Sequence, residues 1–237
     1  MRGMGGMDEE RFDAEVEAGG TGADDAEEYE ARVVDAGVME DELSLVPGDE
    51  DPRDAGLHET ILSEEEVWSG RIFTISDIEV ELPNGHRAGR DVVRHCQAAA
   101  VVALTHTGKI VLVRQYRTAI DRVTVEIPAG KCDAGEDPLD CAKRELEEET
   151  GFVPGKIRHL LTLATSVGFC DELIYMYLAT DLELAGAHPD EDEFVNVDLV
   201  PVSELVDAVL DGKIEDAKTI IAALACDAIA NRLGGVE

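Results

Sequence analysis

The stretch that decides the fold of this chain is Arg144-Glu145-Leu146-Glu147-Glu148-Glu149-Thr150-Gly151-Phe152. Two residues stand before it at fixed offsets: Gly130, then after five residues Glu136, then after seven more Arg144. Seven fixed identities at roughly 7% each would coincide by chance on the order of once in 10⁸ positions. The pattern is therefore specific enough to support a prediction of both fold and chemistry.

The same stretch carries the signals of an α-helix with defined ends. Asp137-Pro138 supplies an N-cap acid followed by proline at the first helical position. Gly151 suits the left-handed residue that ends a helix. Between these ends, Leu139, Ala142 and Leu146 recur at spacings of three and four, so they predict an apolar stripe that faces a core.

A second face of this predicted helix is acidic. Glu145, Glu148 and Glu149 lie at i, i+3 and i+4, and like charges at this spacing repel and cost helix stability. A divalent cation would offset that cost, because Mg²⁺ accepts carboxylate and substrate phosphate oxygens together. The alternative is an ordinary solvated acidic face in an acidic protein. The flanking glycine, glutamate and arginine of the pattern favour the metal site.

The complete pattern is identified as the signature of the Nudix hydrolases, and the likeness extends over about residues 60–230. Four further stretches resemble the ADP-ribose pyrophosphatase branch of that superfamily: Val113–Arg117, Glu126–Gly130, Gly168–Glu172 and Gly212–Thr219. One position departs from the branch, since Val167 stands where proline is usual. The resemblance implies the α/β class, as a Nudix α/β/α sandwich with a mixed sheet. An added N-terminal β-hairpin region, Arg71–Cys96, is expected to exchange between the subunits of a homodimer.

The resemblance also implies a metal site, with Mg²⁺ as the expected ion and Mn²⁺ as the alternative. Glu145, Glu148 and Glu149 are the expected ligands, joined by the backbone carbonyl of Ala129. We expect Arg144 to hold the preceding loop in place, through Glu136 or through a backbone carbonyl, rather than to contact substrate.

A general base is expected on a mobile loop within reach of the attacking water. The acidic segment before the strand predicted at residues 194–201 occupies the place where similar enzymes carry such a glutamate. Glu193 is the first candidate and Glu191 the second, while Glu148 on the helix is the candidate if neither loop residue acts. The alternative is a solvated acidic loop.

Substrate contacts are expected from a few cations, since an arginine fork binds phosphate bidentately. By resemblance, Arg117 contacts the diphosphate or the terminal ribose, with Arg114 nearby, and Glu126 contacts a ribose hydroxyl. Arg90, on the exchanged hairpin, would reach the adenosine bound by the neighbouring subunit. Each of these residues could equally be a surface charge. Trp68 would either stack on adenine or lie in the dimer interface.

Composition limits the other partners. The formal net charge is −33, and residues 1–60 account for −16 of it with 20 acidic and 4 basic side chains. Such a field repels nucleic acid and anionic membranes, so neither is expected as a partner. The five cysteines include no Cys-x-x-Cys pair, which favours a reducing cytoplasm over disulfides or zinc. No apolar run approaches the 18 residues of a membrane span.

The chain is expected to have three parts. Residues 1–57 read as an acidic, disordered extension, residues 58–97 as the N-terminal β region for dimerisation, and residues 98–237 as the Nudix domain. Asn84-Gly85 predicts a tight hairpin turn, and residues 98–104 and 109–115 read as a second hairpin. Two C-terminal helices are expected, one over residues 204–210 capped by Ser203 and one over residues 214–232.

These features together predict a Mg²⁺-dependent enzyme that hydrolyses the diphosphate bond of ADP-ribose to AMP and ribose 5-phosphate. The first alternative is a broader hydrolase of nucleoside diphosphate sugars, such as GDP-mannose. A second alternative, from a different class, is a Nudix module that binds a ligand for regulation. Such modules lose their catalytic glutamates, and the intact acidic face argues against this alternative.

Overall fold

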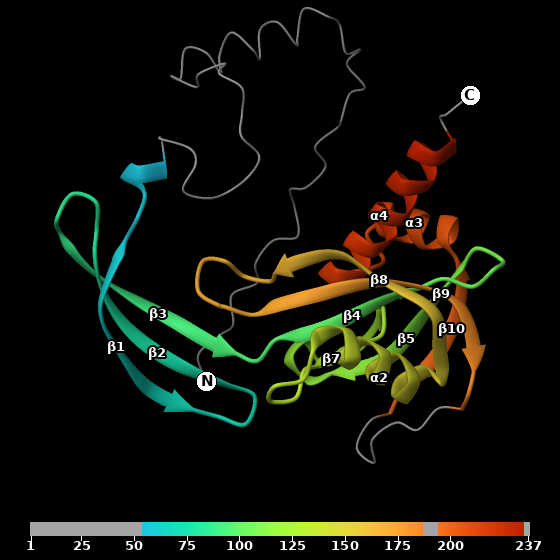
Figure 1. The fold of residues 1–237 in the computed structure, drawn as a ribbon, viewed down its shortest axis with the longest axis horizontal. Coiled ribbons are helices and arrows are strands. Elements are labelled where there is room, and N and C mark those ends of the chain that lie inside the picture. Colours follow the sequence, from blue (N-terminus) through green and yellow to red (C-terminus); the bar gives the residue numbers. More distant parts are fainter. Residues whose placement is uncertain (1–53, 187–193, 235–237) are drawn as a thin grey trace, which may run out of the picture. The chain divides into compact units, whose positions relative to one another are not determined.

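The computed structural model describes residues 54–186 and 194–234 (Figure 1). The chain divides into two compact units, Met1–Leu57 and His58–Glu237. In the first unit the only described element is the short 3-10 helix η1 (Asp54–Gly56). The predicted disorder of the N-terminal extension therefore lies almost wholly outside the described residues.

The second unit opens with a three-stranded antiparallel sheet made of β1 (Thr60–Ser69), β2 (Phe73–Glu81) and β3 (Arg87–His95). The predicted turn at Asn84-Gly85 is confirmed, since Gly85 has φ 79° and the Asn84 side chain accepts the His86 N–H at 3.0 Å. The residue pattern predicts two short strands, over residues 71–75 and 78–82, but the structure has the single strand β2 there. The strand β1 was not predicted, because all ten of its residues are exposed and no alternation of apolar and polar residues marks it.

The centre of the unit is a four-stranded sheet in the order β7-β4-β9-β8. Its strands are β4 (Ala98–Ala103), β7 (Ala129–Lys131), β8 (Phe152–Ala164) and β9 (Leu173–Leu184). The strands β4 and β9 run parallel and the other neighbours antiparallel, which confirms the predicted mixed sheet. A second sheet, in the order β10-β5-β6, contains β5 (Lys109–Arg117), β6 (Arg122–Glu126) and β10 (Asn196–Pro201), with the 3-10 helix η2 (Thr118–Ile120) between β5 and β6.

The second predicted hairpin was wrong. The strands β4 and β5 follow each other in sequence but lie in different sheets. Between them there is an isolated bridge between Leu104 and Ile110, and the Thr105 N–H donates to the Lys109 carbonyl at 2.9 Å. All six residues of β4 are buried. A strand buried on both faces belongs in the middle of a layered structure, and β4 reaches that place by pairing with β7 and β9.

Helices cover both faces of β4, which confirms the predicted α/β/α sandwich (Figure 1). Ala99 and Val101 pack in one core with α2 (Pro138–Thr150). Ala100 and Val102 belong to a second core that includes buried residues of α3 (Val202–Leu210) and α4 (Ala217–Gly234). This alternation follows from the period of two in a strand, which sends successive side chains to opposite faces.

Both C-terminal helices exist, but their starts differ from the prediction. Helix α3 begins at Val202 with Pro201 at the N-cap, so Ser203 lies inside the helix and does not cap it. Helix α4 begins at Ala217, because the carboxylate of Asp216 accepts the Thr219 N–H at 3.0 Å and ends the preceding loop. No helix in residues 54–186 or 194–234 combines the length and apolar character needed to cross a membrane.

The loop before β9 is held against the end of β3. The Val93 N–H donates to the Phe169 carbonyl at 2.7 Å, and the Asp171 carboxylate accepts from the His95 N–H at 2.8 Å and from Arg94 at 3.1 Å. The stretch Gly168–Glu172, one of those that carried the family resemblance, therefore joins the N-terminal sheet to the central one.

Candidate active site

Helix α2 has the ends that the sequence predicted. The Asp137 side chain accepts the Leu139 N–H at 2.8 Å, and Gly151 adopts φ 74° while donating its N–H to the Glu147 carbonyl at 2.7 Å. Leu146 is fully buried in the core beneath the helix. The apolar stripe thus fixes which way α2 faces and leaves its acidic residues at one edge of the sheet.

Arg144 lies at the centre of the site. Its Nε and Nη2 donate to the two carboxylate oxygens of Glu136, each at 2.9 Å, and Nη2 also donates to the Lys131 carbonyl at 3.2 Å. The prediction that Arg144 holds the preceding loop is confirmed through both kinds of partner. Hydrogen bonds from Arg144 and from the Asp133 N–H lower the pKa of Glu136 to about 2, so this carboxylate stays charged.

Arg144 also joins two of the three predicted metal ligands. Its Nη1 donates to Glu145 at 2.8 Å and to Glu148 at 2.9 Å, so one cationic nitrogen lies against both carboxylates. The third carboxylate, that of Glu149, is 3% exposed and accepts the Ala129 N–H at 3.1 Å. The structure therefore brings all three glutamates to the junction of β7 and α2.

Gly130 leaves the space that the Glu145 carboxylate fills at this junction. A Cβ added at Gly130 would fall 2.0 Å from the Cδ of Glu145 and 2.0 Å from its Oε1. No side chain can occupy that space, so only glycine allows the Glu145 carboxylate to lie against β7. This close approach explains why the pattern places a glycine before the helix.

The donor set of this junction suits a hard divalent cation. Carboxylate and carbonyl oxygens are the ligands that Mg²⁺ and Mn²⁺ prefer. Within residues 54–186 and 194–234, however, no three His, Cys, Asp or Glu side chains already converge as a metal cluster. Glu145 and Glu148 are turned toward Arg144, whose guanidinium supplies the positive charge between them. Each carboxylate has about four acceptor positions, so Glu145 and Glu148 can keep these contacts with Arg144 and still offer oxygens to an ion.

Two of the predicted substrate residues form a pair beside this junction. Arg117 donates from Nε and Nη2 to the two oxygens of Glu126, each at 2.7 Å. Burial alone would raise the pKa of Glu126, but hydrogen bonds from Arg117 and the charge of Lys218 lower it to about 2. The contact of Glu126 with a ribose hydroxyl stays a prediction.

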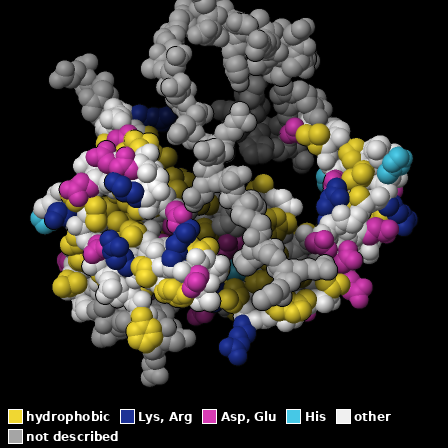
Figure 2. Space-filling model, turned by 180° about the vertical axis from the view of Figure 1, so that it is seen from behind, with side chains coloured by type: hydrophobic (Ala, Val, Ile, Leu, Met, Phe, Trp, Pro, Cys, Tyr) yellow, Lys and Arg dark blue, Asp and Glu magenta, His cyan; other side chains and the backbone are white. Residues whose placement is uncertain are grey.

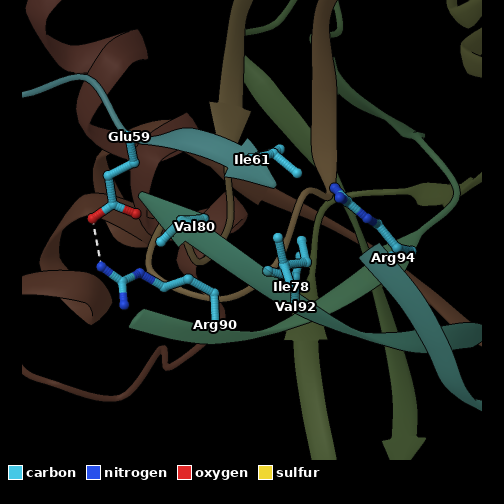
Figure 3. A pocket seen from close by; sticks show the side chains of 7 residues that line it. All are labelled: Glu59, Ile61, Ile78, Val80, Arg90, Val92 and Arg94. Carbon is cyan, nitrogen blue, oxygen red and sulfur yellow. Dashed lines mark hydrogen bonds and ion pairs between the residues drawn. The ribbon is translucent and has the colours of Figure 1, made fainter. Parts of the chain in front are cut away.

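The other predicted substrate residues have different partners. Arg114 donates to Asp198 of β10 at 2.5 Å. Arg90 pairs with Glu59 at the rim of a hollow of about 300 Å³ on the N-terminal sheet, which Figure 3 shows. Ile61, Ile78, Val80, Val92 and Arg94 also line that hollow. The ring of Trp68 packs on that of Phe73 with centroids 5.2 Å apart. The loop candidates Glu191 and Glu193 lie outside the described residues.

Sequence reasoning missed the role of Lys218. This residue is 9% exposed, and its Nζ donates both to Glu126 and, at 2.8 Å, to Asp216. It belongs to the stretch Gly212–Thr219 that resembled the family, but no role was predicted for it. A lysine in the first turn of a helix is usually a surface residue, so its residue type gave no signal.

Charges of both signs mix on the surface. On the face drawn in Figure 2, Lys and Arg side chains stand among Asp and Glu side chains and do not form one basic patch. That the chain binds no nucleic acid stays a prediction.

The assignment to a family follows from comparison with known proteins. The NUDIX domain family matches residues 94–224, which include the whole pattern from Gly130 to Phe152. The chain belongs to the NUDIX family. This membership confirms the resemblance found in the sequence, and the α/β/α sandwich is the fold expected for it.

Curated relatives of this NUDIX protein cover most of its second unit. A methanol dehydrogenase activator from Bacillus methanolicus is 44% identical over 168 residues, 70% of this chain and 91% of the relative. An ADP-ribose pyrophosphatase from Bacillus subtilis (strain 168) is 41% identical over 168 residues, with the same two coverages. A GDP-mannose pyrophosphatase from Salmonella typhimurium is 33% identical over 174 residues, 68% of this chain and 91% of the relative.

A solved structure leads to the same conclusion. The crystal structure of an ADP compounds hydrolase matches with a TM-score of 0.68 and 25% identity, covering 76% of this chain and 98% of the other. The family, the relatives and this neighbour confirm the prediction that the chain is an enzyme of the Nudix pyrophosphohydrolase type.

Proposed function

We propose that this Nudix protein hydrolyses the diphosphate bond of ADP-ribose, so that one water and one ADP-ribose give AMP and ribose 5-phosphate. The observation that carries the proposal is the gathering of Glu145, Glu148 and Glu149 at the junction of β7 and α2. A regulatory module would not need this set intact. The likeness to the Bacillus subtilis ADP-ribose pyrophosphatase supports the choice of substrate.

The proposed metal is Mg²⁺, with Mn²⁺ as the alternative. The carboxylates of Glu145, Glu148 and Glu149 and the carbonyl of Ala129 would hold it. When bound, such an ion neutralises charge on the diphosphate oxygens and makes a bound water a stronger nucleophile. Arg144 stays on the protein side of the site, because Glu136 and the Lys131 carbonyl hold its Nε and Nη2.

Arg117 is the proposed contact for the diphosphate. Its pairing with Glu126 uses Nε and Nη2, and 42% of its side chain is exposed, so the Nη1 amino group can face a phosphate oxygen. Arg114 and Arg90 stay as further candidates that would leave their present carboxylate partners to bind substrate. Glu193 is the proposed base that removes the proton of the attacking water, with Glu191 and then Glu148 as alternatives.

We propose in addition that the protein is a homodimer built on the N-terminal β region, residues 58–97, which contains the strands within Arg71–Cys96. Support comes from β1, an exposed edge strand with large apolar side chains in solvent, among them Val67 at 56% exposed. Light scattering at micromolar concentration should give the mass of a dimer, and Val67→Glu should shift it toward the monomer. Val123→Glu is the matched control, because Val123 is 59% exposed on β6. A fully active wild-type monomer would contradict the proposal. A cytoplasmic location stays a prediction.

The function is tested with the full-length chain and a panel of nucleoside diphosphate sugars. Each compound is incubated with Mg²⁺ or with Mn²⁺, and the products are separated by anion-exchange chromatography. ADP-ribose should have the highest kcat/KM and should give AMP and ribose 5-phosphate in equal amounts. A higher kcat/KM for another sugar nucleotide would overturn the choice of substrate.

The second candidate is a broader nucleoside diphosphate-sugar hydrolase, and the likeness to the GDP-mannose pyrophosphatase favours it. Val167, which departs from the pattern of the ADP-ribose branch, also favours this broader substrate range. Comparable kcat/KM values for ADP-ribose and GDP-mannose would support this second candidate. Tight binding of ADP-ribose by calorimetry without any turnover would instead indicate a ligand-binding module.

A further inference from the structure

The carboxylate of Glu126 is fully occupied by donors from its own chain. A carboxylate offers about four acceptor positions, two on each oxygen. Oε1 accepts from Arg117 Nε at 2.7 Å and from Thr124 Oγ1 at 2.5 Å, while Oε2 accepts from Arg117 Nη2 at 2.7 Å and from Lys218 Nζ. Only 3% of the Glu126 side chain is exposed. No acceptor position is left for a hydroxyl of the substrate.

Lys218 is fixed as firmly as the carboxylate that it contacts. Its side chain is 10% exposed and lies between Glu126 and Asp216, whose Oδ1 accepts from Nζ at 2.8 Å. The other oxygen of Asp216 accepts from the N–H of Thr219 at 3.0 Å and from its hydroxyl at 2.5 Å. The Thr219 hydroxyl in turn accepts the Ile127 N–H at 2.8 Å. The start of α4 is therefore tied to the residue that follows Glu126.

The charges of this cluster balance. Two carboxylates, Glu126 and Asp216, face two cations, Arg117 and Lys218. Removing Lys218 takes a cation away from the buried carboxylate of Glu126, and a buried charge that loses its partner costs more than the intact pair gains. Without Lys218, the two carboxylates would repel each other and would compete for Arg117. The guanidinium would then lose the single orientation that four saturated acceptor positions impose.

We propose that Lys218 and Glu126 are positioning residues for Arg117: Lys218 fixes the carboxylate of Glu126, and Glu126 fixes the guanidinium that meets the phosphate chain of the substrate. This inference rests on the proposed function, in which Arg117 binds the diphosphate. It gives Glu126 a role through Arg117 in place of a direct contact with a ribose hydroxyl. Helix α4 thereby becomes part of the phosphate site without touching substrate.

The first test compares two lysines that differ only in their surroundings. Lys218→Met should raise KM for ADP-ribose about tenfold, equivalent to about 1.4 kcal/mol, and change kcat by less than about threefold, because Arg117 binds phosphate in ground and transition state alike. Lys218→Arg keeps a donor, so its KM should lie close to the wild-type value. Lys213→Met removes the same charge from a side chain that is 68% exposed and should behave as wild type. An unchanged KM in Lys218→Met would overturn the proposal.

The second test separates positioning from direct contact by a double-mutant cycle with Arg117→Ala. If Lys218 acts through Arg117, Lys218→Met should change KM by less than about twofold in the Arg117→Ala background. The same tenfold rise in both backgrounds would overturn the proposal, because Lys218 would then act without Arg117. Should Lys218→Met fail to fold, Thr124→Val removes a different donor to Glu126 and takes its place in the cycle, with the same two outcomes.

A third measurement does not depend on substrate. The Nε–H proton of Arg117 should give a protected NMR signal in the wild-type chain, because Glu126 accepts it, and Lys218→Met should abolish the protection. A signal equally protected in both would overturn the proposal. If the wild-type chain fails to hydrolyse ADP-ribose, the proposed substrate is wrong, and this measurement still decides whether Lys218 positions Arg117.

Discussion

Gly130→Ala is the substitution whose effect can be worked out most directly from the structure. The new Cβ would lie 2.0 Å from the Cδ of Glu145 and 2.2 Å from its Oε2. Non-bonded carbon atoms approach to about 3.5 Å, so the Glu145 carboxylate must move by about 1.5 Å. The carboxylate is the end of a flexible side chain, and Gly130 does not need a positive φ. The fold should therefore survive while the ligand is displaced.

The expected loss follows from that displacement. A misplacement of about 1 Å in a reacting geometry can cost about 10²-fold in rate. We therefore expect kcat for ADP-ribose to fall by about 10²-fold or more, with a higher Mg²⁺ concentration needed for half-maximal rate. The free energy of unfolding should change by no more than about 1 kcal/mol, as is typical of Gly to Ala replacements with a permitted backbone.

The assay is steady-state release of AMP across a Mg²⁺ titration, together with urea unfolding of the same preparation. Gly89→Ala is the matched control, because it lies in β3, needs no positive φ and would place its Cβ at least 4 Å from any neighbour. Wild-type kcat and an unchanged Mg²⁺ requirement in Gly130→Ala would refute the reasoning. Glu145 would then not be a metal ligand in the position that the structure gives it.

Three further predictions concern carboxylates. Glu149→Gln should lower activity by at least about 10²-fold in the AMP assay, since it removes ligand charge. Its circular dichroism spectrum should stay that of a folded protein. Near-normal turnover at saturating Mg²⁺ would exclude Glu149 from the metal site. Glu193→Gln should lower kcat by roughly 10²–10⁴-fold with little change in KM, and Glu191→Gln should lower kcat by less than about tenfold. If the two variants exchange these phenotypes, Glu191 is the base. If neither variant lowers kcat, Glu148 is the remaining candidate for the base. The depressed pKa of Glu126, about 2 against an ordinary value of 4.5, contributes stability that is present above pH 4.5 and lost as the pH falls toward 2. This contribution amounts to about 3 kcal/mol. Urea unfolding at pH 7 should therefore give Glu126→Gln a free energy of unfolding well below that of the wild type. If the difference between the two free energies does not become smaller toward pH 2, the ionised carboxylate is not its source.

The parts of the site that sequence could predict depend on neighbours along the chain. Asp137 and Gly151 mark the ends of α2 through their own backbone preferences, and the spacing within the helix fixes which face is acidic. The pairing of Arg144 with Glu136 spans one loop, so the motif that contains both residues also predicts their contact. Such short-range signals carry the same meaning wherever the segment lies in a fold.

The parts that sequence could not predict depend on residues far apart in the chain. The run from Ala98 to Ala103 signals a buried strand, but nothing in it selects β9 as a parallel partner over the adjacent β5. Lys218 is recognisable as a buried cation only once α4 lies beside Glu126. The pairing of Arg117 with Glu126 likewise depends on the register between β5 and β6. The sequence identified both residues as candidates but did not give that register.

The parallel pairing of β4 with β9 also affects the order in which the protein can assemble. Ala98 is paired with Ile174, so the chain that contains α2 forms one long crossover between the two central strands. Closing such a crossover is slow, because its entropy is lost before the contacts that reward it are made. The N-terminal hairpin of β2 and β3 closes locally and can form early. The apolar face of α2 packs in one core with Tyr177 and Ala179 of β9, so α2 is fully packed only when β9 docks. A folding intermediate without β9 should therefore have no catalytic activity.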